Sequence, residues 1–269
     1  MSKFRIGLAL SGGGAKGFAH AGAIMALKEF NLIPDIVSGT SAGSVVGAFL
    51  CGGFDMQRVP EVFTKYDRGD FISLTVPKDG IFKIDGFLRF LDKELPVKTF
   101  EELNIPLRVV ATDFDKGEIK VFKHGNLVPA VGASSSLPIV FKPMYIDGVH
   151  YVDGGLFKNF PVSVIREECD FVIGINVSPH LNDEYKNTIL YIASKSYQYM
   201  FKSNIMEDLQ MCDFLVEVDE ALQYSVFELA KAQEIYNLGY KRTKDCIEKA
   251  LSDQESPLYR FLNLNTSEE

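Results

Sequence analysis

Hydrophobic and polar positions along the first fifty residues follow two alternating patterns. Residues 4–10 form a continuous apolar run rich in β-formers, which predicts a buried strand, and residues 35–38 predict a second, shorter one. Residues 18–30 and 42–53 carry small and apolar side chains at helical spacing. The resulting order of strand, turn, helix, strand, turn, helix is typical of an α/β fold with a mainly parallel sheet and helices on its faces.

Residues 55–103 break this alternation, because prolines and glycines interrupt short helix-like pieces. Apolar side chains are dense in part of this segment, namely Phe71, Ile72, Leu74, Val76, Ile81, Phe82, Ile84, Phe87 and Leu88. Two interpretations stay open for the segment: a cap over a binding site, or an ordinary packed insertion.

The rest of the chain returns to regular patterns. The predicted elements are a strand at 106–114, a hairpin around Lys116–Gly117, a short helix within 127–138, a hairpin turn at Asp147–Gly148, a buried strand at 171–178, helices at 184–211 and 227–251, and a strand-like run at 214–218. The polar tail from Ser252 is expected to fray. No repeat or linker divides the sequence, so we expect a single domain over 1–269, with 55–103 as a candidate cap and a helical C-terminal part at 184–253.

Composition and charge exclude several classes of protein. A formal charge of −8 argues against a general nucleic-acid binder and gives no bulk attraction to anionic membranes, although a local surface patch for a membrane or micelle stays compatible with it. The chain starts directly in a strand, and its longest uncharged run, 36–54, is too rich in Gly, Ser and Thr for a membrane span. We therefore expect a cytoplasmic protein. The cysteines lack metal-binding spacing and are expected to be free thiols, at Cys51, Cys169, Cys212 and Cys246.

The sequence Gly39-Thr40-Ser41-Ala42-Gly43 fits the pattern G-x-S-x-G. This pattern places a serine on a sharp turn between a strand and a helix, where its hydroxyl is exposed at the end of the sheet. Gly39 and Gly43 leave room where strand and helix meet, and the helix N-terminus favours a developing anion. Ser41 is therefore a candidate nucleophile; the alternative is a packed turn whose serine only caps the helix.

The sequence "SGGGAKG" at 11–17 places a glycine-rich turn before the first helix. It satisfies G-x-G-x-x-G, but a dinucleotide site needs an acidic residue at the end of the second strand, and Asp35 stands at its beginning. The Walker pattern also fails, because Phe18 follows Gly17. Gly12, Gly13 and Gly14 could instead present backbone N–H groups to an oxyanion. The two turns leave neighbouring parallel strands at the same end of the sheet, so we expect them to converge.

A serine nucleophile needs a base that takes its proton. Among the four histidines (His20, His124, His150 and His180), only His180 follows a predicted buried strand. A Ser41–Asp153–His180 triad would match the chain order of α/β-hydrolases, although Ser41 follows only the second strand. Asp153, next to Gly154 and Gly155, could also act directly if a dry site raises its basicity. The residues alone favour Asp153 and His180 equally.

Three motifs in this order resemble the patatin-like phospholipases, particularly their small bacterial members. They are "GGGAKG" at 12–17, "GTSAG" at 39–43 and "DGG" at 153–155, and the likeness covers residues 4–178. The resemblance implies a three-layer α/β/α fold and a Ser–Asp dyad without a catalytic histidine, metal or cofactor. By this resemblance Ser41 is the nucleophile, Asp153 is the general base, and Gly12, Gly13 and Gly14 form the oxyanion hole.

The resemblance also implies a substrate class, which is the acyl esters of phospholipids, lysophospholipids or neutral lipids. The sequence departs from many relatives near Ile139, where they have a glycine, and this leaves the acyl preference open. A regulatory or scaffold protein that keeps the fold without turnover is the alternative from a different class. The intact Ser41, Asp153 and glycine positions argue against it.

Overall fold

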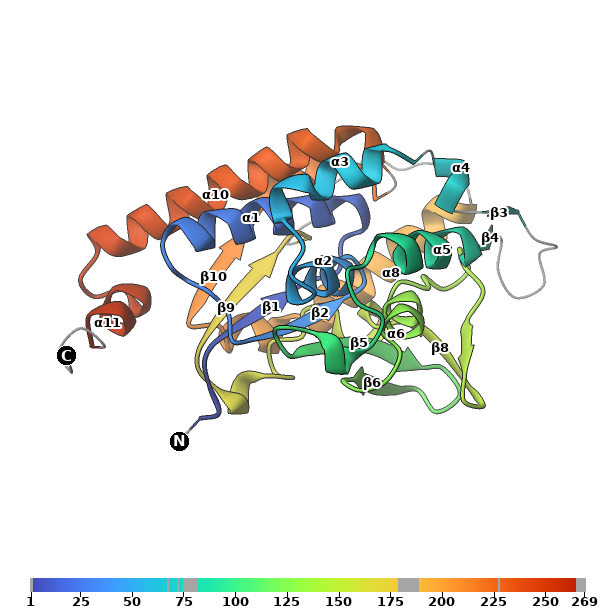
Figure 1. Ribbon diagram of the computed structural model, residues 1–269, viewed down its shortest axis with the longest axis horizontal. Coiled ribbons are helices and arrows are strands. Elements are labelled where there is room, and N and C mark those ends of the chain that lie inside the picture. The colour runs from blue at the N-terminus through green and yellow to red at the C-terminus, as the bar shows by residue number, and fades with distance from the viewer. Residues whose placement is uncertain are drawn as a thin grey trace.

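The computed structural model describes residues 2–66, 68–71, 73–74, 82–178, 189–226 and 228–264. Its centre is a twisted sheet with the strand order β10-β9-β1-β2-β5-β8-β7, and β6 also pairs with β5 (Figure 1). The strands are β1 (Phe4–Leu10), β2 (Ile36–Thr40), β5 (Leu107–Asp113), β6 (Glu118–Phe122), β7 (Met144–Ile146), β8 (Val149–Asp153), β9 (Cys169–Asn176) and β10 (Phe214–Glu217). The strands from β10 to β5 pair in parallel, whereas β6, β7 and β8 pair antiparallel, so the mainly parallel sheet expected from the sequence is confirmed.

Helices cover both faces of this sheet. Alternate residues of β1 such as Leu8 and Leu10 join a large apolar core with α1 (Phe18–Glu29), α2 (Ala42–Cys51), α3 (Val59–Thr64) and α10 (Ala232–Ser252). Ala9 faces a smaller core on the other side, with Phe160, Val162 and Ile205. The three layers of an α/β/α fold follow from this period-two burial along the strands.

The helices α1 and α10 lie side by side over the larger core (Figure 1). Glycines make this contact close: a Cβ on Gly22 would stand 2.0 Å from the carbonyl oxygen of Tyr236, and one on Gly239 would stand 2.0 Å from that of Ala19. The C-terminal part of the chain is thereby tied to the first helix. The remaining helices are α4 (Arg68–Phe71), α5 (Asp85–Glu94), α6 (Leu127–Ser134), α7 (Gly155–Lys158), α8 (Ile189–Asn204), α9 (Met206–Gln210) and α11 (Pro257–Leu264). A separate small sheet pairs β3 (Ser73–Leu74) with β4 (Phe82–Lys83).

Two expectations from the sequence need correction or limitation. The tail from Ser252 was expected to fray, but Pro257–Leu264 forms α11, since Leu258 is fully buried and Phe261 stacks on Phe171 at 4.3 Å between ring centroids. The prediction was wrong because it weighed polar composition and missed these two apolar anchors. Several residues of the candidate cap, including Ile72, Val76 and Ile81, lie outside the described residues.

Candidate active site

The register around β5 brings the ends of two other strands together. One edge of β5 pairs with β6. Along the other edge, the first half of β5 pairs with β2 and the second half pairs with β8. Thr40, the last residue of β2, stands opposite Val110, and Asp153, the last residue of β8, stands opposite the next residue, Ala111. Because β2 and β8 approach this point from opposite directions, Ser41 and Asp153 meet at it.

Ser41 lies on a sharp turn between β2 and α2. Its φ of 51° and ψ of −120° belong to a sparsely populated region for a residue with a side chain, at a cost of roughly 1–3 kcal/mol. Close contacts hold the turn: a Cβ on Gly39 would stand 2.5 Å from the Gly43 carbonyl oxygen, and one on Gly43 would stand 2.2 Å from that of Leu10. The Ser41 N–H donates to Ser134 Oγ at 2.8 Å. These constraints leave the Ser41 hydroxyl at the end of the sheet.

Asp153 is almost completely buried, with 2% of its surface exposed. Burial raises the pKa of its carboxyl to about 6, against hydrogen bonds from the Ser41 hydroxyl, the Gly155 N–H and Tyr197 that lower it. The Gly155 N–H donates to Asp153 Oδ1 at 2.8 Å. A carboxylate with a raised pKa is a stronger base than an exposed aspartate, and it stays largely ionised at neutral pH.

The turn after Asp153 passes close to β5 and to the end of β2. A Cβ on Gly154 would stand 2.3 Å from the Val110 carbonyl oxygen, so only glycine fits there. Buried hydroxyls of β2 then bond to the segment that follows: Thr40 Oγ1 donates to the Lys158 carbonyl at 2.8 Å, and Ser38 Oγ donates to that of Pro161 at 2.7 Å. The small polar residues of β2 thus hold the aspartate turn beside the serine turn.

The glycine-rich turn between β1 and α1 lies against the same site. A Cβ on Gly12 would stand 3.4 Å from Ser41 Cβ, and one on Gly17 would stand 2.8 Å from the Cβ of Ala42. The Gly12 N–H donates to the Asn159 carbonyl at 2.9 Å. Across the described part of the chain, no hydrogen bond takes up the N–H of Gly13 or Gly14. Two backbone donors beside the serine therefore keep capacity for a ligand oxygen.

Three histidines have other partners. His20 is buried, its Nε2 lies 2.8 Å from the Ser11 carbonyl oxygen, and burial lowers its pKa to about 4. At the surface, His124 lies beside Glu101 and His150 lies beside Asp115. His180, the member of the alternative triad, lies outside the described residues.

An apolar cavity of about 170 Å³ opens beside Ser41 and Gly14. Its walls come from the glycine-rich turn, α1, α2, α3, α5, the segment after α6 and the segments before α5 and α10. They include Val46, Val59, Phe63, Phe71, Phe87 and Leu229. Such a cavity favours a hydrocarbon chain whose polar end stays at the serine. Within the described residues no group of three His, Cys, Asp or Glu side chains could hold a metal ion, and no helix is long and apolar enough to cross a membrane.

Sequence reasoning overlooked the supporting residues Ser134, Asn159 and Tyr197. Ser134 Oγ accepts the Ser41 N–H and donates to the Val110 carbonyl at 2.6 Å, so it fixes the serine turn on β5. The run of three serines at 134–136 was the available signal. Asn159 lies just after the Asp-Gly-Gly motif, and this position was the available signal. Tyr197 reaches the site only through a tertiary contact, and nothing in its local sequence marks it.

Comparison with known proteins agrees with this architecture. The sequence model of the family described as patatin-like phospholipase matches residues 8–165. Patatin-like phospholipase domain-containing protein 6 of Mus musculus is 26% identical over 93% of this chain and 22% of its own length. An uncharacterized NTE family protein of Mycobacterium bovis is 30% identical over 65% of this chain and 49% of its own length. The chain thus spans about a fifth of the first relative and about half of the second.

A solved structure shares the fold. The crystal structure of VipD from Legionella pneumophila superimposes with a TM-score of 0.53 at 16% identity, covering 92% of this chain and 67% of VipD. At this identity the likeness concerns the arrangement of sheet and helices only.

Proposed function

Because this chain belongs to the patatin-like phospholipase family, we propose that it is a serine acyl hydrolase. Its substrates are fatty-acyl esters of phospholipids, lysophospholipids or neutral lipids. The observation that carries the proposal is the meeting of Ser41, on its strained turn, with the buried Asp153 carboxyl, whose pKa the Ser41 hydroxyl lowers, next to a cavity lined by apolar side chains.

In the proposed first half-reaction, Ser41 Oγ attacks the ester carbonyl carbon while its proton passes to Asp153. The carbonyl oxygen becomes an oxyanion and accepts hydrogen bonds from the glycine turn. Since the Gly12 N–H already serves Asn159, the proposed donors are Gly13 and Gly14, and Gly12 fixes the turn. Each such donor contributes about 3 kcal/mol to transition-state stabilisation.

The intermediate then breaks its bond to the alcohol oxygen, which takes the proton from Asp153. This step releases the alcohol or lysolipid and leaves an acyl ester on Ser41. In the second half-reaction a water molecule attacks the acyl carbon and gives its proton to Asp153. Release of the fatty acid returns that proton to Ser41, so the enzyme ends unchanged.

Residues of the segment 55–103 support an acyl-binding role. Val59, Phe63, Phe71 and Phe87 line the cavity, and Phe63 and Phe71 stack at 6.2 Å between ring centroids. In the proposal the acyl chain enters this aromatic cavity, while the head group stays outside. The segment therefore contributes to substrate binding as well as to packing.

The experiment that tests the proposal is fatty-acid release from a lipid panel of phospholipids, lysophospholipids and diacylglycerol. We expect the intact protein to release fatty acid from at least one class, and Ser41→Ala to lose on the order of 10³-fold or more. Ser252→Ala, which changes an exposed helical serine, is the matched control and should keep full activity. Equal release by the intact protein and Ser41→Ala on every lipid would refute the proposal, and so would no release at all.

The histidine alternative has its own test. The proposal expects His180→Ala to keep activity within about twofold and Asp153→Asn to lose on the order of 10³-fold. The reverse result would replace the dyad with the Ser41–Asp153–His180 triad.

A further inference from the structure

The last two turns of α8 run along the segment that carries Asp153. Tyr197, Phe201 and Asn204 are spaced so that they share one face of this helix. In this order they contact Asp153, Gly155 and the segment Leu156–Asn159. All three lie beyond residue 165, where the match to the family model ends.

Tyr197 contacts the proposed base itself. Its buried hydroxyl donates to the Asp153 backbone carbonyl at 3.2 Å, and the phenol also lowers the pKa of the Asp153 carboxyl. Burial and the neighbouring carboxylate hold the pKa of Tyr197 well above its usual value, so the phenol stays neutral and remains a donor.

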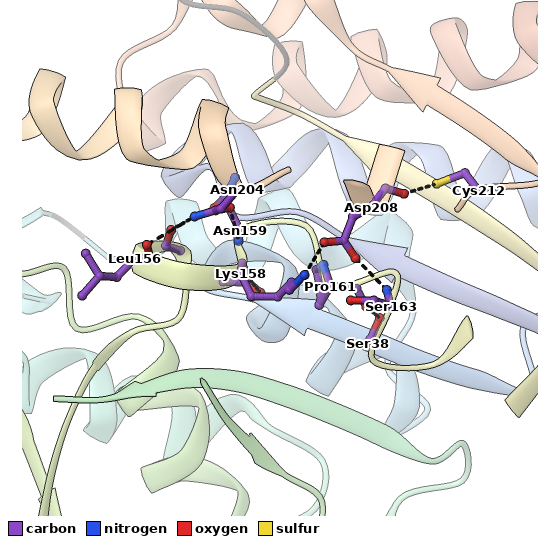
Figure 2. A network of polar contacts seen from close by, with 11 residues as sticks. Ser38, Leu156, Lys158, Asn159, Pro161, Ser163, Asn204, Asp208 and Cys212 are labelled. Atoms are coloured by element: carbon purple, nitrogen blue, oxygen red, sulfur yellow. Dashed lines mark hydrogen bonds and ion pairs between the residues drawn. The ribbon is translucent and has the colours of Figure 1, made fainter. Parts of the chain in front are cut away.

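Phe201 and Asn204 fix the turn that follows Asp153. A Cβ on Gly155 would stand 2.4 Å from the Phe201 ring, and that ring packs edge-on against Tyr197 at 4.4 Å between centroids. Asn204 Nδ2 donates to the carbonyls of Gly155 at 2.9 Å and Leu156 at 3.3 Å. Its Oδ1 accepts the Asn159 N–H at 3.0 Å (Figure 2).

Asp208 of α9 continues these contacts along the same segment. It is completely buried, pairs with Lys158 Nζ at 2.6 Å and accepts the Ser163 N–H at 2.6 Å. Figure 2 shows Asn204 between Leu156 and Asn159, and Asp208 between Lys158 and Ser163. We call the set Tyr197, Phe201, Asn204 and Asp208 the C-terminal clamp.

We propose that Tyr197 is a positioning residue of the Ser41–Asp153 site: packed against Phe201, its hydroxyl holds Asp153 by the backbone carbonyl and so orients the carboxylate toward Ser41. The inference rests on the proposed function. It adds a third residue to the Ser41–Asp153 pair, taken from a part of the chain that the catalytic motifs do not include.

The charged or titratable groups Asp113, Lys158 and His20, on β5, α7 and α1, have other partners. Asp113 of β5 accepts the N–H groups of Asp115 and Lys116, Lys158 of α7 pairs with Asp208, and His20 of α1 bonds to the Ser11 carbonyl. Among the residues that the structure describes, the hydrogen bonds that lower the pKa of Asp153 come from Ser41, Gly155 and Tyr197. Removing the Tyr197 hydroxyl should therefore raise the pKa of Asp153, and base-dependent reactivity should require a higher pH.

The test uses Tyr197→Phe, which removes only the hydroxyl. The readout is the second-order rate of Ser41 labelling by a fluorophosphonate between pH 5 and 9, because labelling forms the Ser41 O–P bond, expels fluoride and passes the serine proton to Asp153. We expect the rate at pH 7 to fall about tenfold and the midpoint of the pH profile to move to higher pH. Tyr199→Phe, on an exposed tyrosine (61%) of the same helix, is the matched control and should leave both unchanged.

A fluorinated tyrosine introduced at position 197 keeps the hydroxyl and should shift the midpoint of the pH profile in the opposite direction. Its more acidic phenol is a stronger donor, so the midpoint should move to lower pH. This variant keeps the test decisive if Tyr197→Phe does not fold. An unmoved midpoint in the variants that fold, whatever their rate, would overturn the inference. Absence of labelling in the intact protein, or equal labelling of Ser41→Ala, would instead count against the proposed function.

Discussion

At the scale of single residues, the site combines two features that each reduce the stability of the folded protein. Ser41 holds a strained backbone, and Asp153 holds a carboxylate that burial disfavours. Short motifs named both residues as candidates, because a glycine-flanked serine and an Asp-Gly-Gly sequence mark tight turns, but the residues alone favoured Asp153 and His180 equally, and only the resemblance selected Asp153. The raised pKa of Asp153 could not be predicted, since it depends on burial by residues distant in sequence.

Asp153→Asn should stabilise the fold at alkaline pH. The folded-state pKa of about 6 exceeds the ordinary value of 3.8, so stability from this group is fully present below pH 3.8 and is lost as pH rises through 6. The ionised form then costs up to about 3 kcal/mol, which asparagine avoids. Thermal melts should show a gain at pH 8 that vanishes toward pH 4.

The matched control for that comparison is Asp115→Asn. Asp115 is exposed and its pKa is lowered, mainly by the hydrogen bond from the His150 N–H, so its stabilising effect is lost as pH falls. Its replacement should reduce stability at pH 8. A gain for Asp153→Asn of the same size at pH 4 and pH 8 would contradict the buried-carboxylate account.

Ile139 is a second strained residue, and it lies near a position where many relatives have a glycine. Its φ of 72° is rare for a β-branched side chain, and 54% of its surface is exposed. Ile139→Gly should raise the free energy of unfolding by about 0.5–1 kcal/mol, because relieved strain exceeds the entropy cost of glycine. Urea unfolding measures this change.

Ile33→Gly is the control for Ile139→Gly. Ile33 is similarly exposed, at 49%, and does not have a positive φ. Ile33→Gly should lower the free energy of unfolding by about as much as Ile139→Gly raises it, because only the entropy cost of glycine remains. Equal losses in both variants would show that Ile139 is not strained in solution.

At the scale of elements, local signals predicted the strands and hairpins well. Asp147 and Gly148 form the expected two-residue turn, with φ values of 51° and 88° that suit these residue types. The placement of α8 and α11 could not be predicted, because their contacts reach strands far away in sequence. The clamp on Asp153 illustrates this limit: its members have helical spacing, but nothing in the sequence indicates what that helix face contacts.

The cavity wall gives a prediction for α5. Phe87→Ala should lower kcat/KM about tenfold for long-chain esters and less than twofold for acetyl or butyryl esters, because only long chains reach this ring. Phe114→Ala, on an exposed phenylalanine outside the cavity wall, should change neither. Equal losses on short and long chains would remove the acyl-binding role of Phe87.

At the scale of the whole molecule, the sheet register brings the site together, and the net charge bears on the proposed action on lipid surfaces. The three-layer α/β/α fold was predictable from alternation and motifs. The meeting of β2 and β8 on one edge of β5 was not, because pairing partners are set by tertiary packing.

The formal charge of −8 predicts weaker action on anionic than on zwitterionic vesicles of matched acyl composition. The difference should shrink as salt rises from about 10 to 300 mM, because screening shortens the range of repulsion to below about 10 Å. Initial rates of fatty-acid release measure this. If release is instead faster from anionic vesicles, and added salt abolishes this preference, a local basic surface must attract the protein to them.

The central claim is that Ser41 is a nucleophile whose proton is taken by Asp153. Peptide mapping after fluorophosphonate treatment, followed over time for the intact protein and Asp153→Asn, tests it most directly. We predict a single adduct on the peptide containing Ser41, formed on the order of 10³-fold more slowly in Asp153→Asn. An adduct on another residue, or an unchanged rate in the variant, would contradict the claim.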